Sequence, residues 1–307
     1  MPNIAFLFPG QGSQAPGMGR DLADAFPAAR RIFEQADEAL GFSISSLCFE
    51  GPAEQLKLTE NTQPAILTCS IAALTALRER GVNASYVAGH SLGEYSALVA
   101  AGAIDFVDAV RLVRKRGRYM QEAVPEGQGA MAALLGLPSD KLEAVCGEAA
   151  QGQVVSPANL NSPSQVVIAG HAEAVERAME LAKAAGAKRA VRLEVSAPFH
   201  CALMKPAQER LAPDLNETPF RDLRTPLVNN VAAREIRRAD EARDGLNQQV
   251  PNPVRWEESI RYLAAHGVDL FIEVGPGKVL TGLLRSIDRS LQGCNVDDPK
   301  SLEALPV

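Results

Sequence analysis

The chain lacks the features that would mark it for export or for a membrane. Its first residues carry no basic segment and only a short apolar run, which does not fit a signal peptide. No stretch approaches the roughly 20 apolar residues that a membrane-spanning helix needs. The five cysteines are odd in number and widely spaced, with no Cys-x-x-Cys pair. This pattern indicates neither a disulfide framework nor a zinc site, and we expect a cytoplasmic protein without a membrane partner.

A surplus of positive charge is also missing. The formal net charge is −6 and there is no polybasic arm, so we expect no general nucleic-acid binding. The glycine-rich loop 10–14 lacks the Gly-Lys-Ser/Thr ending of a P-loop and the full dinucleotide fingerprint. Phosphate binding is therefore the weaker interpretation of this loop. Its flexible backbone can instead present an N–H group to a reacting carbonyl.

The composition that is present, 46% apolar and 22% charged, is typical of a globular protein. A length of 307 residues exceeds the size at which one core usually stops growing, which predicts two structural units. Apolar periodicity predicts strands over 4–8, 224–230 and 268–274 and helices over 20–40, 64–80, 106–124, 202–211 and 256–265. Strand, helix and strand in that order predict an α/β fold with a parallel, hydrolase-like core.

The middle of the chain has a different texture, which predicts an inserted domain. The expected elements are a strand over 130–135, a helix over 139–150, strands over 154–158 and 165–169, a helix over 172–185 and a strand over 190–195. This β-α-β-β-α-β order is ferredoxin-like. We therefore predict a catalytic domain made of residues 1–126 and 197–307, interrupted by a ferredoxin-like domain at 127–196.

A serine motif stands at the junction of a short apolar strand and a helical pattern. Residues 89–93 fit Gly-x-Ser-x-Gly, with Ser91 at the centre. A sharp turn from strand to helix needs small residues on both sides, and Gly89 and Gly93 supply them. Such a turn exposes the serine hydroxyl at a helix N-terminus, where free N–H groups can stabilise an oxyanion. An ordinary glycine-flanked loop is the alternative.

The helix predicted over 106–124 carries five basic residues, and one of them lies on its apolar face. With a helical rotation of about 100° per residue, Arg116 falls within the apolar stripe. A buried guanidinium is energetically costly at such a position unless it meets an anion. A structural ion pair and a ligand carboxylate both explain this position. The other four project together as a solvated basic face: Arg111, Arg114, Lys115 and Arg118.

A nucleophilic serine needs a base, and the chain has four histidines. His90 adjoins the serine, but neighbouring side chains at such a turn usually diverge. His171 lies in the predicted insert, and His266 is placed to cap a helix C-terminus. His200, which follows a predicted strand just after the insert, is the best candidate.

A hydrolase triad would add an acid between serine and histidine. None of the four acids in that part of the larger domain stands at an obvious strand end: Asp105, Asp108, Glu122 and Glu126. A backbone carbonyl can orient the imidazole instead. The missing acid weakens the interpretation as an ordinary hydrolase.

Several motifs in a fixed order give the chain a specific resemblance. They are Gly-Gln-Gly-Ser-Gln at 10–14, Thr-Gln-Pro-Ala at 62–65, Gly-His-Ser-Leu-Gly-Glu-Tyr at 89–95, Arg-Gly at 116–117, Phe-His at 199–200 and Glu-Val-Gly-Pro-Gly at 273–277. Together they resemble the bacterial malonyl-CoA:acyl-carrier-protein transacylase family, from Ile4 to about Leu284.

The resemblance implies roles for individual residues. Ser91 would be acylated, His200 would act as general base and acid, and the backbone amides of Gln11 and Leu92 would form the oxyanion hole. Arg116 would hold the malonyl carboxylate through two bonds.

Two further roles come from the same resemblance. The backbone carbonyl of Gln249 would orient the histidine, although Gln248 is also available and Pro251 alters the local path. Phe199 resembles the malonyl-selective members of the wider group, where its bulk leaves little room for an α-methyl branch.

The implied reaction moves a malonyl group from coenzyme A to the pantetheine thiol of an acyl carrier protein through a malonyl-serine ester. Malonyl-CoA is a substrate, so no cofactor and no metal is expected. Because such carrier proteins are acidic, the solvated basic face is a candidate docking patch. A serine esterase or thioesterase, and a non-catalytic carrier-binding protein, remain the alternatives.

Overall fold

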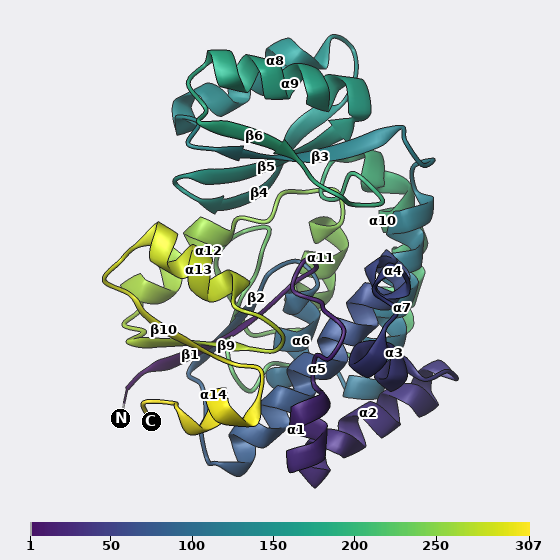
Figure 1. Ribbon diagram of the computed structural model, residues 1–307, viewed down its shortest axis with the longest axis vertical. Helices are drawn as coiled ribbons and strands as arrows, with labels where there is room; N and C mark the ends of the chain where they lie inside the picture. The colour runs from purple at the N-terminus through teal and green to yellow at the C-terminus, as the bar shows by residue number, and fades with distance from the viewer. Residues whose placement is uncertain (1) are drawn as a thin grey trace.

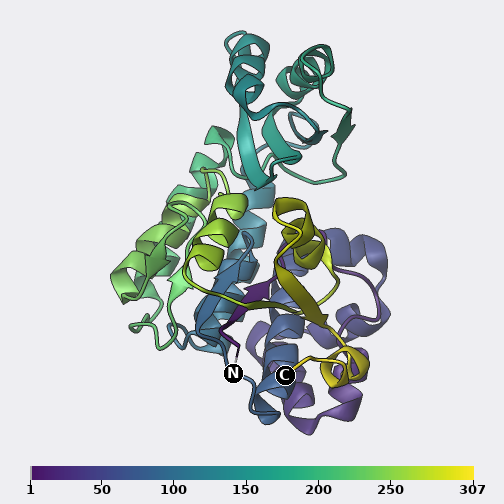
Figure 2. The ribbon, with the colours of Figure 1, turned by 90° about the vertical axis from the view of Figure 1, so that its left-hand side faces the viewer.

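The computed structural model describes residues 2–307, which form two β-sheets with helices packed on them. In Figure 1 the smaller sheet lies at the top, covered on its outer side by two helices, and the larger sheet lies below it. Figure 2 shows the smaller unit standing at one end of the molecule. No helix within residues 2–307 is long and apolar enough to cross a membrane.

The larger sheet has six strands in the order β10-β9-β1-β2-β7-β8, all parallel except for the last pair. The strands are β1 (Ile4–Phe8), β2 (Tyr86–Gly89), β7 (Leu227–Val228), β8 (Glu235–Ile236), β9 (Leu270–Val274) and β10 (Gln292–Val296). The chain is therefore an α/β protein with a mixed, largely parallel sheet.

Helices cover both faces of this sheet, as a parallel sheet requires. The helices of the larger unit are α1 (Arg20–Ala25), α2 (Pro27–Leu40), α3 (Ile44–Glu50), α4 (Ala53–Lys57), α5 (Thr59–Glu79), α6 (Gly93–Ala100), α7 (Phe106–Glu122), α10 (Lys205–Glu217), α11 (Ala239–Gln249), α12 (Trp256–Ala265), α13 (Val279–Ile287) and α14 (Pro299–Glu303), some of which pack on other helices instead of on the sheet. Alternate residues of β1 divide between two cores: Phe6 and Phe8 join the core of α5, α6 and α7, whereas Ala5 and Leu7 join that of α12 and α13.

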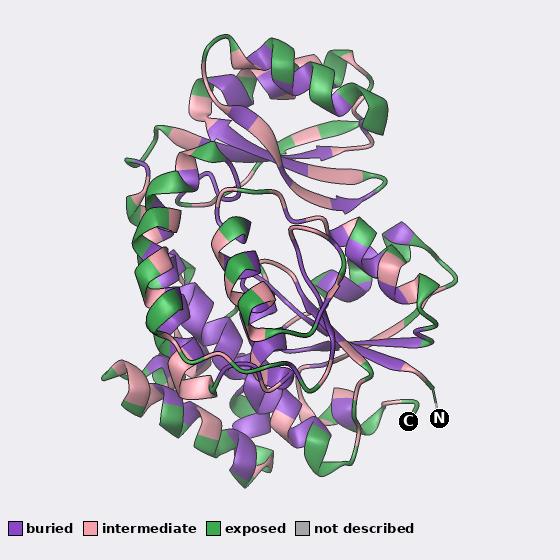
Figure 3. Cartoon of the chain, turned by 180° about the vertical axis from the view of Figure 1, so that it is seen from behind, coloured by how far each residue is buried: buried purple, intermediate pink, exposed green. Residues whose placement is uncertain are grey.

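The smaller sheet is antiparallel, in the order β4-β5-β3-β6. Its elements follow the predicted β-α-β-β-α-β order: β3 (Gly129–Leu135), α8 (Leu142–Ala150), β4 (Val155–Ser162), β5 (Gln165–His171), α9 (Ala172–Ala184) and β6 (Arg189–Arg192). One face of β3 packs under α8 and α9, whereas Met131 on the opposite face joins the core of the larger unit. Figure 3 shows buried stretches of this sheet between the outer helices and the rest of the molecule, whereas β6 is mostly exposed.

The helix predicted from residue 64 begins earlier, because α5 starts at Thr59 and carries Pro64 in its interior. Proline has no N–H for the carbonyl four residues before it, which is that of Glu60. Arg114 of α7 donates to that carbonyl instead, at 2.9 Å. The proline therefore leaves an acceptor that a neighbouring helix satisfies.

Other boundaries differ where the local pattern is weak. The predicted helix over 20–40 is two helices, α1 and α2, separated at Phe26. The strand predicted over 224–230 is reduced to the two residues of β7. The polar helix α11 was not predicted, because a surface helix with few apolar residues gives little periodicity.

The parallel register brings three loops to one edge of the larger sheet. Phe8 at the end of β1 is opposite Gly89 at the end of β2, and Ala88 is opposite Val228 in β7. The segments that follow these strands carry Gln11, Ser91 and Asn230. Since ligands of open α/β sheets bind beyond the carboxyl ends of the strands, this edge is the place for a site.

Candidate active site

Ser91 occupies a strained turn between β2 and α6. Its φ is 51°, in the left-handed region that most side chains avoid. The turn is as tight as its glycines allow, because a Cβ on Gly89 would lie 1.9 Å from the Gly93 carbonyl oxygen. A Cβ on Gly93 would lie 2.0 Å from the carbonyl oxygen of Phe8. Both glycines of the motif are therefore required by close backbone approach.

His200 contacts the serine hydroxyl, with 2.7 Å between Nε2 and Ser91 Oγ. Its Nδ1 donates to the backbone carbonyl of Gln249 at 2.9 Å, which leaves the Nε2 lone pair facing the serine. Burial, and then the positive charge of Arg116, lower the pKa of His200 to about 3. The imidazole is therefore neutral near pH 7, as a general base must be.

The other three histidines are used elsewhere. The ring of His90 makes a 2.8 Å hydrogen bond to Asn161 Oδ1. His171 accepts a hydrogen bond from a backbone amide in the smaller unit. His266 lies at the end of α12, and its Nδ1 hydrogen-bonds to the backbone carbonyl of Tyr262. Of the four, His200 alone contacts the nucleophile within residues 2–307.

The histidine is oriented by a carbonyl rather than by an acid. Glu122 pairs with Arg210, and Asp105 pairs with Arg221, both at the surface. In the part of the chain that the structure describes, none of the four acids considered above hydrogen-bonds to His200. The orienting carbonyl is that of Gln249 and not that of Gln248, which accepts from the Asn252 side chain.

Arg116 is buried, with 1% of its surface exposed. Its Nη1 donates to Gln63 Oε1 at 2.8 Å, and its Nη2 donates to Gln249 Oε1 at 2.8 Å and to Ser91 Oγ at 3.2 Å. All three acceptors are neutral, so the direct hydrogen bonds of the guanidinium leave its charge without a carboxylate partner. Burial lowers the pKa of Arg116, and the nearby Tyr95 and Glu94 oppose that shift.

The glycine after Arg116 explains how a helix can bring a guanidinium so far inside. A Cβ on Gly117 would lie 2.6 Å from the Thr59 carbonyl oxygen and 2.7 Å from the Glu60 Cα. Helices α7 and α5 therefore touch backbone to backbone at this point. The close approach places Arg116 beside Gln63 of α5.

A cavity of about 100 Å³ connects these groups. Gln11 and Leu92 line it beside Ser91 and His200, and Phe199 contributes one wall. Within residues 2–307, neither the Gln11 nor the Leu92 backbone amide donates a hydrogen bond to any acceptor. Two unpaired N–H groups beside a nucleophile are the arrangement that an oxyanion requires.

The smaller unit supplies the apolar side of the cavity. Met131 of β3 lines it together with Leu193 and Val195, which follow β6. The same unit also contributes one polar residue, Asn159 of β4. The cavity therefore lies where the two sheets meet, with most of its polar groups on the larger unit. Burial at this boundary strengthens the electrostatic interactions inside the cavity.

The fold also brings in residues that the sequence analysis did not assign. Asn230 fixes the serine turn: its Oδ1 accepts from the Ser91 amide at 2.7 Å and its Nδ2 donates to the Gly89 carbonyl at 2.7 Å. Gln63 and Glu94 fall inside motifs quoted above, which was a usable signal. Asn230 had none, because it follows a strand of only two residues.

Comparison with known proteins identifies the family. A profile of the acyl transferase domain matches residues 5–305. The malonyl CoA-acyl carrier protein transacylase of Bacillus subtilis strain 168 is 53% identical over 304 residues, covering 99% of this chain and 96% of the relative. The protein of the same name from Escherichia coli strain K12 is 53% identical over 305 residues, 99% of each chain. This chain belongs to the malonyl CoA-acyl carrier protein transacylase family.

A solved structure agrees with this family assignment over the whole chain. It is a malonyl-transacylase in complex with its type II polyketide-synthase acyl carrier protein, with a TM-score of 0.96 and 51% identity. The match covers 98% of both chains. All but one of the residues predicted from the resemblance line one cavity, and the remaining one, Gln249, lies behind His200 with its carbonyl on the ring.

Proposed function

We propose that this protein transfers a malonyl group from coenzyme A to the pantetheine thiol of an acyl carrier protein. The observation that carries the proposal is Arg116, a buried guanidinium that contacts Ser91 Oγ and has only neutral hydrogen-bond acceptors. A cation held next to a nucleophile fits an acyl group that ends in a carboxylate.

In the first step, His200 takes the proton from Ser91 Oγ while the oxygen attacks the malonyl thioester carbonyl. The carbonyl oxygen becomes negative and accepts hydrogen bonds from the amides of Gln11 and Leu92. The tetrahedral intermediate collapses, the carbon–sulfur bond breaks, and the imidazolium protonates the coenzyme A thiolate. A malonyl-serine ester remains.

In the second step, the pantetheine thiol of the carrier protein gives its proton to His200 and attacks the ester carbonyl. The same two amides hold the oxyanion. When the intermediate collapses, the carbon–oxygen bond to Ser91 breaks, and the imidazolium returns the proton to the serine oxygen. The Gln249 carbonyl keeps the imidazole oriented in both steps. The chemistry uses side chains and backbone groups of this chain, and we propose that it needs neither a metal nor a redox cofactor.

Selectivity for malonyl is assigned to two residues. Arg116 binds the carboxylate, which an acetyl group lacks. Phe199 is buried against the cavity and leaves little room for a branch on the α-carbon. We expect malonyl to be preferred over both acetyl and methylmalonyl groups.

The domain organisation belongs to the same proposal. The strand order β4-β5-β3-β6 supports a ferredoxin-like insert at 127–196. The strand-turn-helix at Ser91 on a largely parallel sheet supports a hydrolase-like catalytic domain at 1–126 and 197–307. All five cysteines are free thiols, which supports a place in the cytoplasm.

Part of the basic face of α7 is proposed to bind the acidic carrier protein. Arg114 is excluded from it, because it pairs with Glu60 of α5, and Lys115 pairs with Asp214. The exposed residues Arg111 and Arg118 remain. Arg118→Glu should raise the KM for the carrier protein at low salt without changing the KM for malonyl-CoA; unchanged kinetics would reject the patch.

Intact-mass measurement after adding malonyl-CoA tests the function. A malonyl adduct that Ser91→Ala abolishes, and that a carrier protein then removes as malonyl-carrier, supports transfer. Rapid conversion to free malonate supports an esterase or thioesterase instead. Neither adduct nor turnover supports a non-catalytic carrier-binding protein.

A further inference from the structure

A buried acid lies beneath the serine turn and takes no part in the steps above. Glu94 is the second residue of α6 and is fully buried. Its Oε2 accepts from the backbone amide of Asn230 at 3.0 Å and from the side-chain Nε2 of Gln249 at 2.9 Å. One carboxylate oxygen therefore contacts two segments that reach the site from far along the chain.

The side-chain amide of Gln249 has one permitted orientation in these surroundings. Its Nε2 faces three oxygen atoms, those of the Glu94 carboxylate, the Ser91 carbonyl at 3.1 Å and the Asn230 side chain at 3.2 Å. Its Oε1 faces Nη2 of Arg116 at 2.8 Å. A rotation by 180° would set an NH₂ against a guanidinium and an oxygen against three oxygens, which leaves buried groups unpaired.

Gln249 holds both the histidine and the arginine of the site. Its backbone carbonyl holds the His200 ring, and its side-chain carbonyl holds Nη2 of Arg116. The group that fixes its amide therefore controls where the guanidinium points. We propose that Glu94 is a positioning residue that aims Arg116 at the malonyl carboxylate by fixing the side-chain amide of Gln249, an inference that rests on the proposed transfer function.

The second carboxylate oxygen of Glu94, Oε1, can carry a proton without disturbing the hydrogen bonds to Oε2. Oε1 of Glu94 has no hydrogen-bond partner within the described chain, and a Cβ on Gly245 of α11 would lie 3.9 Å from it. Burial raises the pKa of Glu94 to about 7, against the opposing effects of Asn230, Gln249 and Arg116. A proton on Oε1 leaves Oε2 free to accept both bonds, so acceptor geometry rather than charge carries the positioning.

Replacing the acid by an apolar side chain of similar volume tests this assignment. In Glu94→Met the amide of Gln249 loses its strongest acceptor, and Arg116 loses its alignment. We expect kcat/KM for malonyl transfer from malonyl-CoA to fall about thirtyfold to a hundredfold. Transfer from acetyl-CoA, which has no carboxylate to align, should fall less than about fivefold, so the malonyl-to-acetyl ratio drops.

A conservative variant and a matched control separate positioning from general damage. Glu94→Gln keeps an oxygen acceptor and should retain the wild-type malonyl-to-acetyl ratio. Ser96→Ala changes another fully buried polar residue of the same helix, whose hydroxyl has no partner in the described chain. It should leave both rates and the ratio unchanged, with circular dichroism confirming that every variant is folded.

Two results would overturn the inference. Equal losses of malonyl and acetyl transfer in folded Glu94→Met would show that the acid supports the serine turn and not Arg116. A loss of the ratio in Glu94→Gln equal to that in Glu94→Met would contradict an acceptor role. If Glu94→Met does not fold, Glu94→Ala is measured alone and in combination with Arg116→Ala. Once Arg116 is absent, Glu94→Ala should have no further effect on the malonyl-to-acetyl ratio. Failure of the wild type to form a malonyl-serine adduct would instead reject the proposed function.

Discussion

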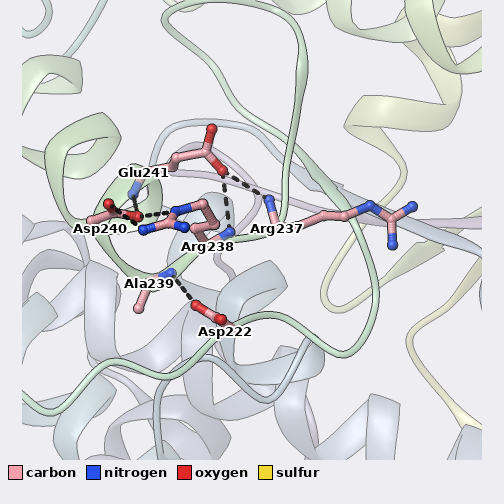
Figure 4. A network of polar contacts seen from close by, with 6 residues as sticks. All are labelled: Asp222, Arg237, Arg238, Ala239, Asp240 and Glu241. Carbon is pink, nitrogen blue, oxygen red and sulfur yellow. Dashed lines mark hydrogen bonds and ion pairs between the residues drawn. The ribbon is translucent and has the colours of Figure 1, made fainter.

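Both ends of helix α11 carry a network of hydrogen bonds that includes an arginine, but one end is exposed to solvent and the other is buried. At its start, Arg238 donates two bonds to the carboxylate of Asp240, each 3.0 Å, and Glu241 accepts from backbone amides of the preceding turn. Figure 4 shows this network, in which the paired side chains of Arg238 and Asp240 are exposed. At its end, Gln249 is fully buried and bonds to His200 and Arg116.

The two ends differ in how far their polar groups are exposed to solvent. Exposed ion pairs are screened by water and salt and contribute little to stability. A buried amide or guanidinium that loses its partner keeps the full cost of its desolvation. At the start of α11 exposed carboxylates, including Asp222 from outside the helix, satisfy the free amides. Its end instead fixes the position of the reacting groups. Four predictions test this contrast, in order of decreasing effect.

Loss of the base at the buried end should have the largest effect. His200→Ala removes the group 2.7 Å from Ser91 Oγ, and we expect kcat/KM for malonyl transfer to fall about a thousandfold. Steady-state transfer to a carrier protein measures it. His171→Ala is the matched control, because that ring contacts a backbone amide of the smaller unit, and its activity should be unchanged. A fall of less than tenfold in His200→Ala would remove this histidine from the mechanism.

Loss of the buried cation should come next and should be selective. Arg116→Ala removes the proposed carboxylate partner, and we expect malonyl transfer to fall about a hundredfold, or about 2.7 kcal/mol in the barrier. Acetyl transfer should change much less. Arg118→Ala removes an exposed arginine from the same helix and should leave the malonyl-to-acetyl ratio unchanged. Equal losses on both acyl groups in Arg116→Ala would contradict the assignment.

The pH dependence of stability should reveal two buried groups that act in opposite directions. Burial holds the pKa of His200 at about 3, below its ordinary 6.5, so the unfolded chain binds the extra proton and stability falls as pH falls from 6.5 to about 3. Burial raises the pKa of Glu94 from 4.5 to about 7, so the folded chain binds the extra proton and stability falls as pH rises through that range. Between pH 4.5 and 6.5 the two contributions oppose each other.

Glu94→Gln removes one of these contributions. Relative to wild type, its free energy of unfolding should decrease as the pH falls from 7 to 4.5, by about 1 kcal/mol per pH unit. Urea unfolding of both proteins at pH 5, 6, 7 and 8 gives the difference. A difference that is constant across this range would show that the Glu94 carboxyl does not titrate there.

The exposed end should give the smallest effect. Asp240→Asn breaks the paired contact with Arg238, and we expect Tm to shift by less than about 3 °C and kcat/KM to stay at the wild-type value. Thermal unfolding at low and high salt measures the first, and the transfer assay the second. A large loss of activity would mean that the start of α11 also controls the position of Gln249.

The sequence alone determined the local features of the site. The spacing of Gly89, Ser91 and Gly93 predicted the strained turn, because a tight turn excludes a Cβ at defined positions. The helical period placed Arg116 on the apolar side of α7, and the structure buries it there. The element order of the middle segment also followed from periodicity, because alternation and the 3.6-residue repeat are properties of short windows.

Only the tertiary structure decided which distant groups meet. Gln249 rather than Gln248 holds His200, and Asn230, Gln63 and Glu94 complete the network, through bonds between residues as far as 158 positions apart. It also removed Arg114 from the solvated basic face, since that side chain satisfies a carbonyl left free by Pro64. Periodicity reports whether a side chain is buried. Its partners depend on how helices and strands from separate parts of the chain pack, which no short window contains.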